Sequence, residues 1–100
     1  MDNRSFQKVA KALADPRRFE IFQKIATSGA EGMCCGAVCE EFPVSQATVS
    51  HHLKELTEAG LLESRSEGQF KYWSANAEIM SEYIAELQNR LGLPKAKSRK

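Results

Sequence analysis

The chain has 100 residues, of which 42% are hydrophobic and 27% are charged, and its formal net charge at pH 7 is +1. This length is typical of one small domain, and no apolar run approaches the ~20 residues of a membrane span or the shorter core of a signal peptide. The composition therefore predicts one cytoplasmic globular domain without contact to a membrane, whose modest core would benefit from a partner subunit.

The first two elements are predicted to be helices that meet at Asp15-Pro16. Residues 4–14 place apolar side chains on one stripe and basic side chains beside it. Aspartate can serve as the N-cap and proline as the first residue of the second helix, which we expect to run from 16 to about 27. The residues that this helix is expected to bury are Phe19, Phe22, Ile25 and Ala26.

Residues 33–42, MCCGAVCEEF, predict a short amphipathic helix. Its apolar side chains follow the spacing i, i+3, i+4, i+7, and they are Cys35, Val38, Cys39 and Phe42. Only Pro43-Val44 separates this helix from the next one. Two helices joined by so short a turn form a helix-turn-helix.

Residues 44–64, VSQATVSHHLKELTEAGLLES, predict a helix that offers a polar stripe to a DNA groove. Ser45 can cap its start, and Gly60 can end it in the left-handed conformation. Val49, Leu53 and Leu56 make a buried seam at helical spacing. The opposite face carries Gln46, Ala47, Ser50, His51 and Lys54.

That polar face suits the major groove, which admits a helix only where the leading residues are slim. Glutamine, serine and histidine can then bond to base edges. A polar helix face is usually only solvated, and it is the complete order of helix-turn-helix and hairpin that favours DNA reading. The DNA contacts predicted on this helix are Gln46, Ala47, Thr48, Ser50, His51 and Lys54.

After Gly60 the spacing of apolar residues is no longer helical. The sequence predicts two strands, LLESR and QFKYWS, around the turn SEG, which contains a glycine. A helix-turn-helix followed by a hairpin is a winged helix. Arg65 and Lys71 on this wing are predicted to reach phosphates or a minor groove. The predicted fold class is mainly α with a small β-hairpin, built from five helices and a two-stranded wing.

A last helix is predicted from about 77 to 91, closed by Gly92 and Pro94. Its apolar stripe is wide enough to need a second covering surface, so we expect a homodimer through the first and last helices. The stripe consists of Ile79, Met80, Tyr83, Ile84, Leu87 and Leu91. Residues 1–92 are then the DNA-binding and dimerisation domain, and 93–100 a basic, disordered tail.

The charge is distributed unevenly along the chain. Residues 1–28 carry +3, residues 29–43 carry −3, residues 44–73 carry −1 and residues 74–100 carry +2. The reading module is therefore not basic. Affinity for phosphate should come from dimerisation, from Arg17-Arg18 and from the tail lysines.

These residues resemble the ArsR/SmtB family of dimeric winged-helix repressors over nearly the whole chain. KALADPRRFEIFQKIA is similar to the family's opening helices, VSQATVSHHLKELTEAGLL to its recognition helix and RSEGQFKYW to its wing. The resemblance implies a homodimer that represses from an imperfect palindromic operator in double-stranded DNA until an effector lowers its affinity. It also places Gln46, Ala47, Ser50 and His51 at base-contacting positions.

Members of this family differ chiefly in their effector. Zinc-sensing members place acidic and histidine ligands on the last helix, whereas the last helix here has neither histidine nor cysteine. Arsenite-sensing members carry C-x-C-x-x-C, and the aligned residues here are Cys34, Gly36 and Cys39, with an extra thiol at Cys35. Soft cations select thiolates, so Cys34, Cys35 and Cys39 are the candidate site for arsenite or another soft metal ion.

Three alternatives stay open for the cysteines and for the chain. The thiols can be buried core residues, since Cys35 and Cys39 share a stripe with Val38 and Phe42. They can be redox-active, although a disulfide between residues one helical turn apart requires local distortion. The chain can also be a ligand-free winged helix or a protein-interaction module. No nucleophile-base motif and no phosphate loop is present, so an enzyme is not expected.

Overall fold

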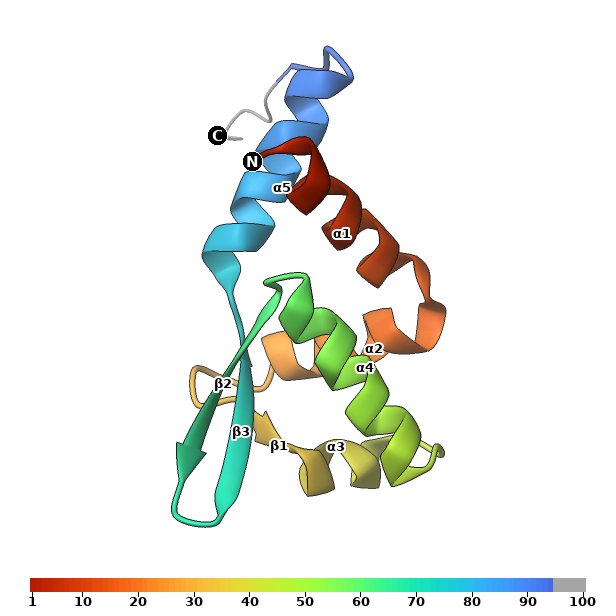
Figure 1. Cartoon of the computed structure of the whole chain (residues 1–100), viewed down its shortest axis with the longest axis vertical. Coiled ribbons are helices and arrows are strands. Elements are labelled where there is room, and N and C mark those ends of the chain that lie inside the picture. The colour runs from red at the N-terminus through yellow and green to blue at the C-terminus, as the bar shows by residue number, and fades with distance from the viewer. Residues whose placement is uncertain (95–100) are drawn as a thin grey trace, which may run out of the picture.

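The computed structural model describes residues 1–94, which form five helices and three strands (Figure 1). Their order along the chain is α1 (Asn3–Ala14), α2 (Pro16–Ala26), β1 (Met33–Cys34), α3 (Cys35–Glu41), α4 (Gln46–Glu58), β2 (Leu62–Glu67), β3 (Phe70–Ala75) and α5 (Ala77–Arg90). The predicted winged helix-turn-helix is confirmed. Of the predicted tail, residues 95–100 lie outside the described part.

The ends of the helices follow from the capping residues in the sequence. The side chains of Asp15 and Ser45 accept hydrogen bonds from backbone amides of α2 and α4, as predicted. Pro16 is the first residue of α2. At the other end of α4, Gly60 has φ +85°. The amide of Leu61 then donates to the carbonyl of Leu56 at 3.0 Å, which turns the chain sharply into β2.

One core holds the helices and the hairpin together. The predicted seam of α4, Val49, Leu53 and Leu56, is almost fully buried in it. On α2 the prediction was partly wrong, because Phe19 is 42% exposed and Ala26 is exposed, whereas Ile21 is fully buried. The remaining buried apolar residues are Val9, Ala12, Phe22, Ile25, Val38, Leu61, Leu62 and Tyr83.

The sheet has three strands in the order β1-β3-β2, so the wing gains a short strand that the sequence did not predict. Met33 pairs with Trp73 and Cys34 with Tyr72, and α3 begins at Cys35 instead of Met33. Gly32 makes this approach possible, because a Cβ there would lie 2.0 Å from the Trp73 carbonyl oxygen. The first hairpin strand extends further than predicted, to Glu67, and the second begins at Phe70, so the turn lies at residues 68 and 69.

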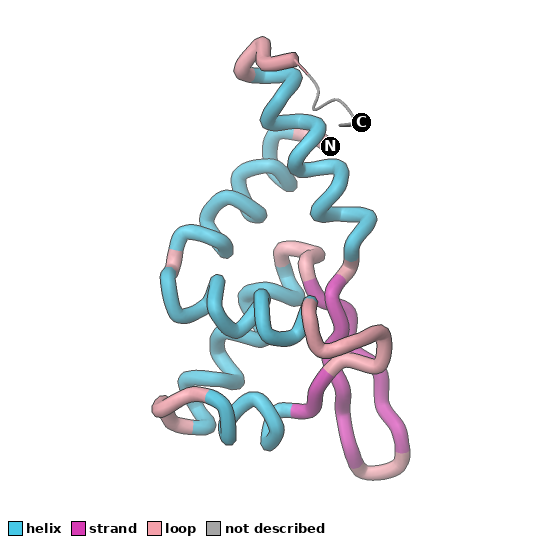
Figure 2. The backbone as a smooth tube through the Cα atoms, turned by 180° about the vertical axis from the view of Figure 1, so that it is seen from behind, coloured by secondary structure: helices cyan, strands magenta, loops and turns pink. Residues whose placement is uncertain are grey.

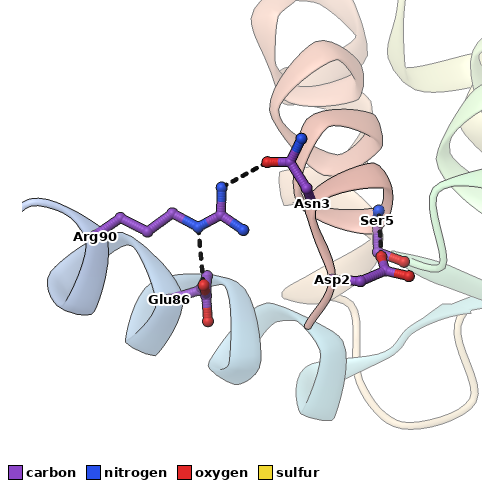
Figure 3. A network of polar contacts seen from close by, with 5 residues as sticks. All are labelled: Asp2, Asn3, Ser5, Glu86 and Arg90. Carbon is purple, nitrogen blue, oxygen red and sulfur yellow. Dashed lines mark hydrogen bonds and ion pairs between the residues drawn. The ribbon is translucent and has the colours of Figure 1, made fainter.

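The first and last helices lie together at the end of the molecule away from the hairpin (Figures 1 and 2). The rings of Phe6 and Tyr83 are 5.2 Å apart. The guanidinium of Arg90 lies 4.0 Å from the centre of the Phe6 ring. It also donates to both Glu86 and Asn3 at 2.8 Å (Figure 3). These contacts fix α5 on α1. No helix in residues 1–94 is both long and apolar enough to cross a bilayer.

Candidate nucleic-acid interface

Helix α4 presents a continuous exposed stripe on the side opposite its buried seam. The exposure follows from helical geometry, since the three seam residues are anchored in the core. Ala47 and Thr48 near its start are short, and Ser45, the cap, also donates to Thr48 at 3.0 Å. All six predicted contact residues of this helix are exposed: Gln46, Ala47, Thr48, Ser50, His51 and Lys54.

A groove of about 310 Å³ separates α4 from the hairpin. Lys54 lies on its helix side and Lys71 on its hairpin side, and Lys71 is held 5.4 Å from the Trp73 ring. The other lining residues are Ser50, Thr57, Glu58, Ser64 and Trp73. The two ammonium groups outnumber the single carboxylate of Glu58, and with the hydroxyls of Ser50 and Ser64 they suit the oxygens of a phosphodiester.

Arg65 is on the other face of the hairpin. It pairs with Tyr72, whereas Lys71 is the next residue, and neighbouring residues of a strand point to opposite faces. Its guanidinium lies 4.9 Å from the Tyr72 ring and donates to Glu67 at 3.1 Å and to the Glu31 carbonyl at 2.7 Å. The structure thus brings Lys71, but not Arg65, to the groove beside α4.

The three cysteines lie on two elements. Cys34 is in β1, and its partner across the sheet is Tyr72. Cys35 and Cys39 are one turn apart on α3, and burial together with the neighbouring Cys35 raises the pKa of Cys39. In residues 1–94 no three histidine, cysteine or acidic side chains are placed to hold one metal ion. The predicted three-thiolate site is therefore not assembled in this conformation.

Cys35 also connects α3 to the exposed stripe of α4. Its Sγ lies 3.7 Å from the Oγ of Ser50, within the range of a weak hydrogen bond. A group attached to this thiol would therefore stand next to one of the predicted DNA contacts.

The burial of His52 was not predicted, and Arg18, which was predicted to contribute to phosphate affinity, is hydrogen-bonded to this histidine. His52 is 7% exposed, and its Nδ1 accepts a hydrogen bond from Nε of Arg18 at 3.2 Å. Burial lowers the pKa of His52, and this outweighs the opposing effect of Asp15. The helical spacing could have indicated that His52 is buried, because His52 follows the seam residue Val49 by three positions and therefore lies on the same side of α4.

Comparison with known proteins gives the same architecture. Residues 13–65 match a family model described as a helix-turn-helix domain. The arsenical resistance operon repressor of Bacillus subtilis is 32% identical over 83 residues, which cover 83% of this chain and 77% of the repressor.

Two solved structures agree over most of the chain. An ArsR-like transcriptional regulator from Rhodococcus sp. RHA1 has a TM-score of 0.77 at 25% identity, covering 89% of this chain and 80% of that one. A homodimeric winged helix-turn-helix domain from Mycobacterium bovis has a TM-score of 0.70 at 23% identity, covering 97% and 89%. At 23% identity, the similarity to the Mycobacterium bovis domain shows only that the two chains share a fold.

Proposed function

Because the chain belongs to the ArsR/SmtB family of winged-helix transcriptional regulators, we propose that it is a repressor that binds operator DNA as a homodimer. The observation that carries the proposal is the exposed stripe of α4, with slim residues at its start and a lysine-lined groove beside it. In this arrangement α4 lies in the major groove. The DNA strand that borders the groove passes between α4 and the hairpin.

The stripe and the groove make different contributions to DNA binding. Gln46, Ser50 and His51 carry hydrogen-bonding groups that can read base edges, which gives sequence preference. Lys54 and Lys71 line the groove, where they neutralise phosphates whatever the sequence. Arg65 is engaged with Glu67 and Glu31, so we assign it to the stability of the wing instead of to DNA contact.

The homodimer is supported by apolar surface at the end formed by α1 and α5. Ile84 is 48% exposed on α5, and Leu91 and Leu93 beyond it are 64% and 55% exposed. Large exposed apolar side chains that lie together mark an interaction surface. A two-fold dimer through this end would present two α4 helices to one side of a duplex. The homodimeric solved structure has the same fold.

We further propose that a thiol-reactive effector such as arsenite releases the operator. Support comes from the relative that represses an arsenical resistance operon and from the Cys35 thiol beside Ser50. Cys35 and Cys39 can act together, whereas Cys34 joins them only if β1 separates from Tyr72. A redox-responsive or ligand-free regulator is the second candidate, favoured by the partly buried positions of all three thiols.

Fluorescence anisotropy on duplexes selected from a random-sequence pool tests the repressor function. We expect salt-sensitive binding that prefers selected over scrambled DNA. The absence of any preference would contradict the function and favour a protein-interaction module.

The effector is tested on the same complexes by adding arsenite, with zinc, cadmium and peroxide in parallel. Arsenite is expected to release wild-type protein and to fail on Cys35→Ser and Cys39→Ser. If release persists unchanged in Cys34→Ser, the site uses two thiols. If arsenite has no effect on wild type, the arsenite proposal is wrong while DNA binding stands.

A further inference from the structure

Helix α4 carries a buried histidine directly behind its DNA-reading stripe. His52 is the one polar or charged residue of residues 1–94 that is buried, at 7% exposure. Its neighbour His51 is exposed on the stripe, and the two rings are 5.9 Å apart. His52 therefore takes no part in the proposed base contacts, although any movement of its ring would be passed to residues that do.

Arg18 links this ring to two other helices. Its Nε donates to Nδ1 of His52 at 3.2 Å, and its Nη1 donates to the carbonyl of Ala12 in α1 at 3.5 Å. Its own amide donates to the Asp15 cap at 2.9 Å, which fixes it at the start of α2. Arg18 and His52 thus join α1, α2 and α4 at one point.

This hydrogen bond exists for only one protonation state of the histidine. An arginine side chain donates hydrogen bonds and never accepts them, so Nδ1 must be the unprotonated nitrogen. The ring is then neutral, with its proton on Nε2. A second proton would turn Nδ1 into a donor facing a donor and would place a positive charge beside the guanidinium.

We propose that His52 is a positioning residue for DNA binding, whose neutral ring holds α4 on α2 through Arg18, and that protonation breaks this hydrogen bond and weakens operator binding. The inference rests on the proposed function and adds a means of regulating it. It concerns the orientation of α4, because a rigid helix that tilts at His52 displaces Ser50 and His51 from their bases.

The charges around the ring favour the neutral form. Burial opposes a positive charge on His52 most strongly, and Arg18 and Arg17 on α2 and His51 on α4 oppose it too. Asp15, at the start of α2, favours the charge but is outweighed. These influences lower the pKa of His52, so the hydrogen bond is intact at neutral pH and breaks on acidification.

The chain has two histidines, which allows a clean comparison. In His52→Asn the amide oxygen can replace Nδ1 as the acceptor and does not titrate, whereas His52→Leu keeps bulk without an acceptor. His51→Asn removes the other imidazole. Binding of each full-length variant to a selected duplex and to a scrambled duplex is measured by anisotropy, with circular dichroism as the check on folding.

Because the pKa of His52 is lowered, we expect wild type to lose only a few-fold in preference for the selected duplex between about pH 7.5 and about pH 5.5, and more as the pH falls further. His52→Asn should bind almost as well as wild type at the higher pH and show no such loss. His52→Leu should bind weakly throughout. His51→Asn should bind less tightly yet keep the pH dependence.

A flat wild-type profile would overturn the inference, as would a pH dependence that survives in His52→Asn or disappears in His51→Asn. Should His52→Asn not fold, Arg18→Gln removes the opposing charge and should flatten the profile. Nitrogen NMR of the free protein gives an independent check, since a His52 ring protonated on Nδ1 at neutral pH contradicts the hydrogen bond. Absence of any sequence preference at neutral pH would instead contradict the proposed function.

Discussion

Lys71 and Arg65 are neighbours in the wing but have different roles in the structure. Lys71 lines the groove beside α4, whereas Arg65 is turned to Tyr72, Glu67 and the Glu31 carbonyl. Removing a charge at either position changes the net charge of the chain by the same amount. A comparison of the two variants therefore separates local phosphate binding from overall electrostatic attraction.

We predict that Lys71→Gln weakens binding to operator and scrambled DNA alike. The slope of log affinity against log salt should fall by about 0.9 for each phosphate that the variant no longer neutralises. Arg65→Gln is the matched control and should leave the slope unchanged. Equal changes in the two variants would show that the groove is not the phosphate site.

His52 also makes the stability of the free protein depend on pH. Its pKa is lowered in the folded state, so the unfolded chain binds the proton more readily. The free energy of unfolding should be insensitive to this group above about pH 6.5 and should fall as the pH drops below that value. Urea unfolding at a series of pH values measures this, and His52→Asn should remove that part of the decrease. An increase in stability on acidification through this range would contradict the assignment.

At the scale of elements, the path from α2 to α3 depends on one close approach. Gly32 has φ +81°, and a Cβ there would lie 2.0 Å from the backbone oxygen of Trp73. This approach creates β1 and places Cys34 on the sheet instead of on α3.

Gly32→Ala should therefore destabilise the protein by about 2 kcal/mol or more, because backbone must move and the φ is strained. Gly36→Ala, in α3 with no atom within 4 Å of the new Cβ, is the control. It should be neutral or stabilise by about 0.5 to 1 kcal/mol, since alanine is the better helix former. Thermal unfolding of both variants measures this difference in stability, and similar melting temperatures would contradict the close approach of Gly32 to the Trp73 backbone.

The helices were predictable because capping residues and apolar spacing are local signals. Asp15, Ser45 and Gly60 mark ends of helices, and the seam of α4 needs no tertiary information. The two-residue strand Met33–Cys34 is too short to show a period. It exists because it pairs with β3, which is distant in the sequence, and local patterns do not contain that pairing.

The candidate site was predictable to a similar degree. The stripe of α4 follows from its period, and its five residues are exposed as expected, as is Thr48. The register of the hairpin decides on which of its faces Arg65 and Lys71 lie. The turn predicted from the sequence, SEG, differs from the observed one, so this register was not predicted. His52 was overlooked because a buried polar residue has no place in a pattern of apolar residues, and its partner Arg18 is 34 positions away.

At the scale of the whole molecule, the proposed DNA contacts and the proposed dimer surface lie at opposite ends. Helices α3 and α4 and the hairpin lie at one end, and α1 and α5 lie at the other (Figure 1). The first end carries the proposed DNA contacts, and Ile84, Leu91 and Leu93 are exposed at the second. A dimer through the second end is expected to place its two α4 helices about 34 Å apart, one turn of DNA.

Ile84→Glu should convert the dimer into monomers, because Ile84 is already exposed in the protomer and a charge there harms only an interface. Phe70→Glu, at an exposed apolar residue in the hairpin, is the control and should remain dimeric. Sedimentation of the free proteins distinguishes these outcomes. An Ile84→Glu protein that sediments as a dimer would place the interface elsewhere.

The claim that α4 reads bases is tested most directly by the ratio of affinities for selected and scrambled duplexes, measured for wild type, Ser50→Ala and His51→Ala. Each substitution should lower the affinity for selected DNA by about 1 to 3 kcal/mol and change binding to scrambled DNA far less. Equal losses on both duplexes would show that α4 does not lie in the major groove as proposed.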